Sequence, residues 1–298
     1  MPALFRKLVV VGVGLIGGSF ALALKRAGAV SEVVGIGRSA ASLDVAVRRG
    51  IIDRIGAADG ATLRDADLVL LAIPVGQMAA AMRAIAPHLG ADTVVTDAGS
   101  TKAGVVAAAR EAFPATLSQF VPAHPIAGAE LSGPAAATAD LYAGRRVVVS
   151  PLAETSPAAR ARVESAWLAC GARLSVMSPE AHDRIFATVS HLPHLLAYAL
   201  VHELCERDNA GELFGFAASG FRDFTRIAGS SPEMWRDIFL ENRGALIAEL
   251  DRYVAKLGTL RARLDAGDGA ALERLLEKAS RARKDWAVDQ DACNDGGG

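Results

Sequence analysis

The sequence predicts an α/β fold in which a doubly wound, mostly parallel sheet occupies the first half of the chain and an all-α domain follows. Short β-branched runs alternate with helical segments through the first half. A glycine-rich turn, Gly12-Val13-Gly14-Leu15-Ile16-Gly17, follows the first of these runs. After Pro179 the strand patterns end, and apolar residues recur at every third or fourth position.

The strands are expected where aliphatic residues cluster between glycine, proline and polar residues, which is typical of strands buried on both faces. These runs are Leu8–Val11, Glu32–Ile36, Leu68–Ile73, Thr93–Thr96, Phe120–Pro122, Arg146–Val149 and Leu174–Val176. Helical spacing is found at Ser19–Ala27, Leu43–Arg49, Gln77–His88, Thr101–Ala112 and Ser156–Cys170. Because strands alternate with helices, we expect βαβ units and a parallel sheet.

The composition excludes several classes of protein. The chain of 298 residues has 32 Lys and Arg against 33 Asp and Glu, a net charge of −1. Proteins that bind nucleic acids or anionic membrane surfaces usually carry a basic excess, so we expect neither partner. Apolar residues make up 51% of the chain and charged residues 22%, which excludes disorder for most of its length.

The cysteines indicate a reducing compartment. Cys170, Cys205 and Cys293 are an odd number, and their spacing does not suit a metal site. We expect Cys170 and Cys205 to be small buried apolar residues.

The uncharged segment Leu8–Leu24, preceded by Arg6 and Lys7, raises the alternative of a signal or membrane segment. Ala21-Leu22-Ala23 even has the pattern of a signal-peptidase site. The glycines in the middle of the segment favour a different explanation, given next. No other part of the sequence is expected to cross a bilayer, so we expect a cytoplasmic protein.

The glycine-rich turn lies between a strand and a helix, as in a Rossmann-type dinucleotide site. Gly12 allows the tight turn, Gly14 lets the backbone approach a pyrophosphate, and Gly17 lets helix and strand pack closely. The pyrophosphate would lie at the positive end of the helix, beside Leu15 and Ile16. The alternative is a glycine-rich turn that binds no ligand.

We therefore expect a dinucleotide-binding domain at residues 1–178 and a helical domain at residues 179–288. Residues 180–206 and 232–285 of the second domain have long helical periods with few breakers. The last segment, 289–298, has no core-forming pattern, so we expect a disordered tail.

The second strand bears on the choice of cofactor. NAD-specific sites usually place Asp or Glu about 20 residues beyond the glycines, for the ribose hydroxyls. This chain has Gly37-Arg38-Ser39 there. Arg38 can face a 2′-phosphate and Ser39 can hydrogen-bond to it, which favours NADP, or the use of both NADP and NAD. The alternative is that Arg38 is a solvated surface residue.

The ends of later strands carry the candidate catalytic residues. Ile73 and Pro74 either border the nicotinamide or merely end the third strand. Ser100 or Thr101 would cap the following helix, which leaves the other hydroxyl free to point into the crevice. His124 lies in Pro122-Ala123-His124-Pro125, and a rigid loop at a strand end suits a general base.

The helical half offers groups for an anionic, ring-bearing substrate. Arginines and aromatic residues lie close together in Gly220-Phe221-Arg222-Asp223-Phe224-Thr225-Arg226 and Trp235-Arg236-Asp237. The alternative is Arg–Asp pairing within the helices. His191 and His194 have the spacing of a metal pair, but no cysteine or carboxylate completes it, so we expect no metal.

The chain resembles the prephenate/arogenate (cyclohexadienyl) dehydrogenase family of tyrosine biosynthesis, in its monofunctional form. The resemblance rests on GVGLIGGS at 12–19, DAGSTK at 97–102, HPIAG at 124–128, SHLPH at 190–194 and GFRDFTRIAGSSPEMWRDIF at 220–239. It implies oxidative decarboxylation of prephenate to 4-hydroxyphenylpyruvate, or of arogenate to tyrosine, with hydride transfer to NAD(P). It also implies a homodimer formed through the helical domain, to which the long segment Trp235–Leu264 would contribute apolar faces.

The resemblance also implies roles for the residues. His124 would be the base, Ser100 would hydrogen-bond to the substrate hydroxyl or the imidazole, and Thr101 would lie at the cofactor. Arg226 would bind a substrate carboxylate, with Arg222 as a weaker candidate. Further pocket residues would be His191, His194 and Trp235. At Ala129, followed by Glu130, some relatives have a hydroxyl residue instead.

Two alternatives to this function stay open. One is another two-domain hydroxyacid or imine dehydrogenase. Enzymes acting on β-hydroxyacids resemble one another in a catalytic lysine on the first long helix of the second domain, and Pro179–His202 contains none. The other is a nucleotide-binding regulator without turnover, which the presence of both His124 and Ser100 disfavours.

Overall fold

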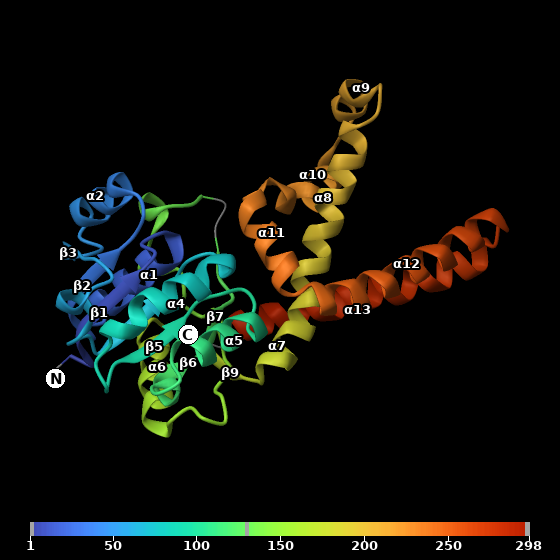
Figure 1. Cartoon of the computed structure of the whole chain (residues 1–298). Helices are drawn as coiled ribbons and strands as arrows, with labels where there is room; N and C mark the ends of the chain where they lie inside the picture. Colours follow the sequence, from blue (N-terminus) through green and yellow to red (C-terminus); the bar gives the residue numbers. More distant parts are fainter. Residues whose placement is uncertain (1–2, 129–130, 296–298) are drawn as a thin grey trace. The chain divides into compact units, whose positions relative to one another are not determined.

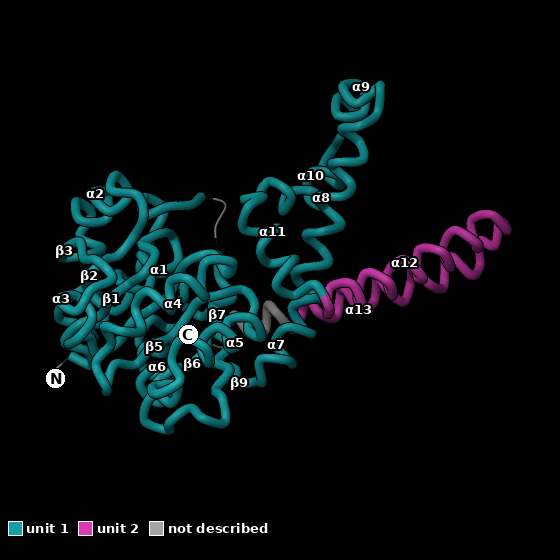
Figure 2. The backbone as a smooth tube through the Cα atoms, in the orientation of Figure 1, with its two compact units in different colours: residues 1–243 teal, residues 244–298 magenta. Residues whose placement is uncertain are grey.

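The computed structural model describes residues 3–128 and 131–295, so Ala129 and Glu130 lie outside the described residues. Contacts along the chain divide it into two compact units, Met1–Arg243 and Gly244–Gly298 (Figure 2). All the candidate site residues named above belong to the first unit or lie outside the described residues.

The first unit contains a parallel sheet of six strands in the order β3-β2-β1-β4-β5-β6 (Figure 1). The strands are β1 (Phe5–Val11), β2 (Val30–Ile36), β3 (Arg54–Ile55), β4 (Leu68–Leu71), β5 (Val94–Asp97) and β6 (Phe120–Val121). This is the strand order of a doubly wound dinucleotide-binding sheet, which confirms the predicted fold class. The short strand β3 was not predicted, because two residues are too few to show a pattern.

Helices cover both faces of this sheet. Alternate β1 residues point to opposite faces: Leu8 and Val10 pack with α1, α2 and α6, whereas Val9 and Val11 pack with α3, α4 and α5. The helices and short 3-10 turns are α1 (Leu15–Arg26), α2 (Ala40–Arg48), α3 (Gly60–Leu63), η1 (Val75–Gln77), α4 (Met78–Ile85), η2 (Ala86–His88), α5 (Ala103–Ala112), η3 (Leu117–Gln119), η4 (Pro134–Ala136) and α6 (Pro157–Ala169).

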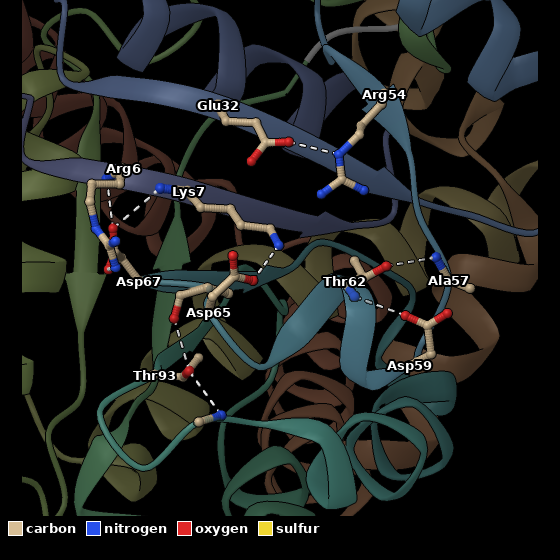
Figure 3. Close-up of polar contacts among 12 residues, drawn as sticks. Arg6, Lys7, Glu32, Arg54, Ala57, Asp59, Thr62, Asp65, Asp67 and Thr93 are labelled. Atoms are coloured by element: carbon tan, nitrogen blue, oxygen red, sulfur yellow. Dashed lines mark hydrogen bonds and ion pairs between the residues drawn. The ribbon is translucent and has the colours of Figure 1, made fainter.

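Polar contacts close the amino end of the sheet (Figure 3). Asp67, just before β4, accepts hydrogen bonds from the backbone N–H groups of Arg6 (2.6 Å) and Lys7 (3.2 Å) at the start of β1. Arg54 of β3 pairs with Glu32 of β2 at 2.7 Å. These contacts fix the starts of the strands. Ligands of doubly wound sheets bind at the opposite, carboxyl ends of the strands, where we therefore expect the crevice.

A second, three-stranded sheet was not predicted. It has the order β7-β8-β9, with β7 (Ala123–Pro125) antiparallel to β8 (Arg146–Val149) and β8 parallel to β9 (Arg173–Val176). His124 therefore lies in a strand and not in a loop, and the expected placement is wrong in this respect. Pro125 is tolerated because β7 is an edge strand, where a missing N–H donor breaks no ladder.

Helices follow from Pro179 onward, as predicted. Within the first unit they are α7 (Pro179–Phe186), the π-helical turn η5 (Ala187–His191), α8 (Leu192–Cys205), α9 (Ala210–Gly215), α10 (Ser219–Thr225), η6 (Arg226–Gly229) and α11 (Pro232–Glu241). The wide turn η5 directly precedes the first turn of α8, where Pro193 has no N–H to donate. The continuous helical segment Pro179–Cys205 is long and apolar enough to cross a bilayer by length and composition, against our expectation. Those two properties alone are weak evidence of a span, since core helices share them.

The second unit consists largely of α12 (Arg243–Asp265), which begins one residue before it, and α13 (Gly269–Asp295) (Figure 2). The segment Trp235–Leu264, which was expected to contribute apolar faces to a dimer, is divided at Asn242 between α11 and α12. The helix α13 continues through Asp295, so residues 289–295 of the expected disordered tail are helical. Between Gly269 and Gly296 the sequence contains no glycine or proline that would end the helix.

Two further expectations can be compared with the structure. The segment Leu8–Leu24 forms a strand, a turn and most of a helix around the core, so it is not one spanning helix. Cys170 is buried, as expected, and burial raises the pKa of its thiol to about 12. Cys205 is exposed at the end of α8, so its expected burial is wrong. The side chain of Cys293 lies outside the described residues.

Candidate active site

The glycine turn has the geometry that a bound pyrophosphate requires. Gly12 has a φ of 95°, and a Cβ there would collide with the carbonyl oxygen of Ala72. A Cβ at Gly17 would collide with the carbonyl oxygen of Gly12, so helix and turn approach as closely as backbones can. A Cβ at Gly14 would meet nothing within 4 Å. The open space beside Gly14 fits the phosphates of a dinucleotide.

The helix α1 begins directly at this turn. Its first residue is Leu15, four positions earlier than predicted, and Gly14 precedes it without a side-chain cap. The first N–H groups of a helix, here those of Leu15, Ile16 and Gly17, lack intrahelical partners and favour an anion. The half-buried side chains of Leu15 and Ile16 flank the turn.

Other predicted cofactor residues lie at the ends of β2 and β4. The half-buried Ile73 follows β4 and packs against Gly12, and Pro74 begins the turn η1. Arg38 is exposed after β2. Ser39 caps α2 by accepting a hydrogen bond from the backbone N–H of Ser42 at 3.2 Å.

A buried ion pair fixes the loop that follows β5. The side chains of Asp97 and Lys102 pair with each other and are both fully buried. Asp97 also accepts hydrogen bonds from the backbone N–H groups of Gly99 (2.8 Å) and Ala123 (3.1 Å). The half-buried Ser100 is thus held in a loop that is tied to the strand bearing His124.

A carboxylate from another helix caps α5. Asp183 of α7 accepts hydrogen bonds from the backbone N–H groups of Lys102 and Ala103, each at 2.8 Å. The expectation that Ser100 or Thr101 caps this helix is therefore wrong. Thr101 is fully buried, and its hydroxyl has no hydrogen-bond partner within residues 3–128 and 131–295.

His124 belongs to a row of three polar side chains. Its Nδ1 lies 2.8 Å from Nε2 of His182, and Nδ1 of His182 lies 2.8 Å from Oδ1 of Asp183. The ring of Phe186 packs against both imidazoles, with centroids 5.0 Å from His124 and 4.4 Å from His182. His182 is fully buried, whereas His124 is half-buried and retains an accessible edge.

The surroundings keep both imidazoles neutral. Burial lowers the pKa of His124 well below its usual value, and the nearby His182, Lys102 and His191 disfavour a further positive charge there and lower it more. Burial also lowers the pKa of His182, and Asp183 offsets this only in part. Burial alone would raise the pKa of Asp183, but hydrogen bonds from His182 and from two backbone N–H groups outweigh it and lower the pKa.

A further polar contact connects this row to the predicted substrate pocket. Asn242 donates a hydrogen bond from Nδ2 to the carbonyl oxygen of Asp183 (2.8 Å), and the same nitrogen lies 3.1 Å from Nδ1 of His191. His194 stacks on Trp235 with ring centroids 3.6 Å apart. The structure therefore brings His191, His194 and Trp235 together.

The two predicted substrate arginines are both exposed. Arg226 begins η6. Burial is the main cause that lowers the pKa of His194, and the charge of Arg226 lowers it further. Arg222 lies on α10. Arg236 pairs with the adjacent Asp237 at 2.6 Å, which confirms pairing within the helix for this arginine.

Over the part of the chain that the structure describes, no group of three or more His, Cys, Asp and Glu side chains could hold a metal ion. His191 directs Nδ1 toward Asn242, and His194 directs Nδ1 toward the carbonyl oxygen of Ser190 at 2.8 Å.

Sequence reasoning missed five residues around this site: Asp97, Lys102, His182, Asp183 and Asn242. The sequence did contain a signal for the first two. Asp97 ends a buried strand and Lys102 lies in the glycine loop that follows it. Burying either charge is costly unless the two side chains pair with each other. The adjacent His182 and Asp183, at the start of a helix, were a signal of the same kind.

A nucleotide-binding turn at the carboxyl ends of parallel strands and a neutral imidazole beside it together define a two-domain, nucleotide-dependent dehydrogenase. Comparisons with known proteins give the family. Residues 20–176 match the family model described as prephenate dehydrogenase, nucleotide-binding domain, and residues 178–278 match prephenate dehydrogenase, dimerization domain. The chain belongs to the prephenate dehydrogenase family.

Individual relatives agree with this assignment. The cyclohexadienyl dehydrogenase of Zymomonas mobilis is 35% identical over 96% of this chain and 98% of its own length. The crystal structure of the Aquifex aeolicus prephenate dehydrogenase, in complex with hydroxyphenyl propionate and NAD+, has a TM-score of 0.88 at 35% identity, covering 94% of this chain and 98% of that one. The Synechocystis arogenate dehydrogenase has a TM-score of 0.80 at 29% identity, over 94% and 100% of the two chains. The chain is an oxidoreductase with a nicotinamide dinucleotide as its cofactor.

Proposed function

We propose that this chain oxidises prephenate to 4-hydroxyphenylpyruvate, or arogenate to tyrosine, with loss of CO2 and hydride transfer to NAD(P), as a step of tyrosine biosynthesis. The observation that carries the proposal is the neutral, half-buried imidazole of His124 in β7, which is tied to the carboxyl end of β5. A neutral imidazole at this edge of the sheet can accept a proton from a hydroxyl whose carbon faces the cofactor.

Each residue then has a defined part in the reaction. A bound nicotinamide supplies the hydride acceptor. His124 takes the proton of the ring hydroxyl, so that a carbonyl can form as the hydride leaves. Loss of the ring carboxylate as CO2 provides the electron pair that makes the ring aromatic, and the phenolate oxygen then takes the proton back. Ser100, in the loop fixed against β7, hydrogen-bonds to the hydroxyl or to the imidazole.

Substrate binding falls to the helical part of the first unit. Arg226 pairs with a substrate carboxylate, and Arg222 is a weaker candidate for the same role. The stacked rings of His194 and Trp235, with His191 beside them, form the apolar and polar wall that a cyclohexadiene ring requires. Thr101, Ile73 and Pro74 are proposed to border the cofactor.

The direct test is steady-state kinetics with prephenate and arogenate, each against NAD and NADP. Reduction of either cofactor by either substrate supports the proposal, and the four kcat/KM values rank the substrates and cofactors. A folded protein that binds NAD(P) but reduces it with neither acid would contradict the proposal.

We propose that the cofactor is NADP, or both NADP and NAD. The support is the exposed Arg38 and the first turn of α2, whose N-terminus is capped by Ser39 and favours a phosphate. The substitution Arg38→Asp should shift the ratio of kcat/KM values toward NAD. An unchanged ratio would contradict the preference for NADP without affecting the proposed reaction.

We propose that the chain forms a homodimer through its helical domain. Many apolar side chains on α12 and α13 are exposed, among them Ile247, Val254, Leu257, Leu264, Leu276, Trp286 and Val288. Two helices alone cannot bury so many apolar groups, and a second copy of the chain would cover them. Sedimentation velocity across a range of concentrations should give a dimer, and a stable monomer would contradict this.

We keep the functional boundary at residues 178 and 179, with the nucleotide-binding domain before it and the helical domain, residues 179–288, after it. The two family models, which meet between residues 176 and 178, support this division.

We propose that the protein acts in the cytoplasm. The cytoplasm supplies nicotinamide dinucleotides, which suits the proposed function, and it is a reducing compartment, which suits the free thiol of Cys170.

A further inference from the structure

A row of hydrogen bonds joins the N-terminus of α5 to His124. The backbone N–H groups of Lys102 and Ala103 donate to Asp183, each at 2.8 Å. The same carboxylate lies 2.8 Å from Nδ1 of His182, and Nε2 of His182 lies 2.8 Å from Nδ1 of His124. Each contact is within normal hydrogen-bond distance, so the protonation of one group determines that of the next.

The direction of the row follows from its first member. Asp183 is held as a carboxylate by two backbone donors at a helix N-terminus, and a carboxylate only accepts hydrogen bonds. His182 must therefore carry its proton on Nδ1. A neutral imidazole has one N–H group, which leaves Nε2 of His182 as an acceptor.

The same reasoning determines the tautomer of His124, the proposed base. Because Nε2 of His182 has no proton to give, the hydrogen bond between the two rings must be donated by Nδ1 of His124. A neutral His124 then has its lone pair on Nε2, which makes no hydrogen bond to any residue that the structure describes. This is the tautomer that a general base needs at a substrate hydroxyl.

We propose that His182 and Asp183 are positioning residues that hold His124 in its Nδ1–H tautomer and stabilise the positive charge it acquires during turnover. The proposal rests on the proposed function, in which His124 is the base. As the O–H bond of the substrate breaks, an N–H bond forms at Nε2 of His124. The two rings then share one extra proton, opposite the carboxylate of Asp183, until the phenolate oxygen takes a proton back.

Other charged and titratable groups around the rings do not reverse this order. Lys102 faces them from the position just before α5, but its ammonium is paired with the buried carboxylate of Asp97. His191 faces them from η5, and the side-chain amide of Asn242 lies 3.1 Å from its Nδ1. Phe186 packs against both imidazoles and places an apolar ring beside the contact between them.

The decisive variant is Asp183→Asn. Oδ1 of Asp183 faces both His182 and the N–H of Lys102, whereas Oδ2 accepts from Ala103. With its NH2 group at the Oδ1 position, the asparagine donates to His182 and reverses the row, while its amide oxygen still accepts from Ala103 and the bond from Lys102 is lost. His124 would then carry its proton on Nε2 and could not act as a base. We expect kcat at neutral pH to fall by about 10²- to 10⁴-fold, the scale seen when an orienting carboxylate is replaced by an amide. The control is Glu180→Gln, an exposed carboxylate on the same helix, which should leave kcat unchanged.

A second variant separates orientation from charge. In His182→Gln the side-chain amide can accept from His124 and donate to Asp183, so the tautomer is kept, but glutamine cannot take up a proton. We expect a loss of kcat smaller than that of Asp183→Asn. A larger loss would overturn the role of the row in setting the tautomer.

A direct observation of the tautomers needs no substrate. In the full-length protein labelled with ¹⁵N at histidine, two-bond ¹H–¹⁵N correlation spectra should show His182 and His124 both protonated at Nδ1, and Asp183→Asn should move both protons to Nε2. An Nε2–H form of His182 in the wild-type protein would overturn the proposal, even if the variant fails to fold. Wild-type kcat in a folded Asp183→Asn variant would overturn it as well. An unaltered protein that does not oxidise prephenate or arogenate would instead contradict the proposed function, whatever its tautomers.

Discussion

Lys102 and Asp97 form an ion pair in which both side chains are completely buried, at the carboxyl end of β5. The same carboxylate accepts the backbone N–H groups of Gly99 and Ala123. The pair therefore joins the loop that bears Ser100 to the strand that bears His124, and the relative placement of these two candidate catalytic groups depends on it.

Removal of one partner should destabilise the fold strongly, because the other charge is then left buried and unpaired. We expect Lys102→Met to lower the free energy of unfolding by roughly 3–5 kcal/mol. The matched control is Arg110→Met, which breaks the exposed pair with Glu154 and should cost at most about 1 kcal/mol. Urea unfolding of both variants makes the comparison. Equal losses in the two variants would show that the buried pair has no special role.

The glycine turn offers a test that separates folding from cofactor binding. A Cβ at Gly17 would collide with the backbone of Gly12, whereas a Cβ at Gly14 would meet no protein atom within 4 Å. We expect Gly17→Ala to lower the unfolding midpoint. Gly14→Ala should unfold like the wild type but raise the Kd for NAD(P) about tenfold or more, because its methyl group occupies the phosphate space. Unchanged cofactor affinity in Gly14→Ala would place the pyrophosphate elsewhere.

Loss of the base should reduce turnover and not folding. We expect His124→Asn to lower kcat by about two to four orders of magnitude, the usual effect of removing a general base. The Kd for the cofactor should change little, since the glycine turn is intact. His202→Asn, at an exposed position on α8, is the control. Near-normal turnover in the folded His124→Asn variant would remove His124 from this role.

These residues show how far the sequence could predict the molecule. The order of strand, glycine turn and helix is a local pattern. Gly12 and Gly17 are needed because the backbone approaches closely within this turn or at the end of the adjacent strand, and Gly14 leaves open space beside the same turn. The sheet and the all-α second half follow from such local patterns. The short strand β3 does not, because two residues give no periodicity. The second sheet does not either, because its strands β7 and β8 pair across more than 20 positions of the chain and no local pattern records that pairing.

The candidate site depends on contacts that no local pattern records. Asp183 caps a helix that begins 80 positions earlier, and His182 contacts His124 across 58 positions. Placement after predicted strands indicated His124 and Ser100 as candidates, and the motifs shared with the family added their roles and that of Arg226. Neither indicated what orients the imidazole. Either Ser100 or Thr101 was expected to cap α5 because hydroxyl residues usually cap helices, and a carboxylate from a distant helix takes that position instead.

The substrate arginine should affect binding more than chemistry. We expect Arg226→Ala to raise KM for prephenate about 30-fold, which corresponds to roughly 2 kcal/mol for a lost carboxylate pair. Arg222→Ala, on the neighbouring helix α10, should have a smaller effect. Steady-state kinetics at saturating cofactor would measure both. An unchanged KM in Arg226→Ala would assign the carboxylate to another group.

The buried histidines should make the protein sensitive to acid. Burial lowers the pKa of His191 to about 4. An unfolded histidine titrates near 6.5, so between about pH 6.5 and 4 the unfolded chain binds more protons than the folded one. The free energy of unfolding must then fall as the pH falls, by roughly 3 kcal/mol from this group alone, with no further loss from it below about pH 4.

The contribution of His191 can be isolated by substitution. His191→Gln keeps an acceptor for the amide of Asn242 but does not titrate, so its free energy of unfolding should depend less steeply on pH between 6.5 and 4. His124 and His182, whose pKa values are also lowered by burial, retain their part of the slope in this variant. The exposed His202→Gln should behave like the wild type. Urea unfolding at several pH values checks this, and identical slopes for His191→Gln and the wild type would show that His191 is not held neutral by the fold.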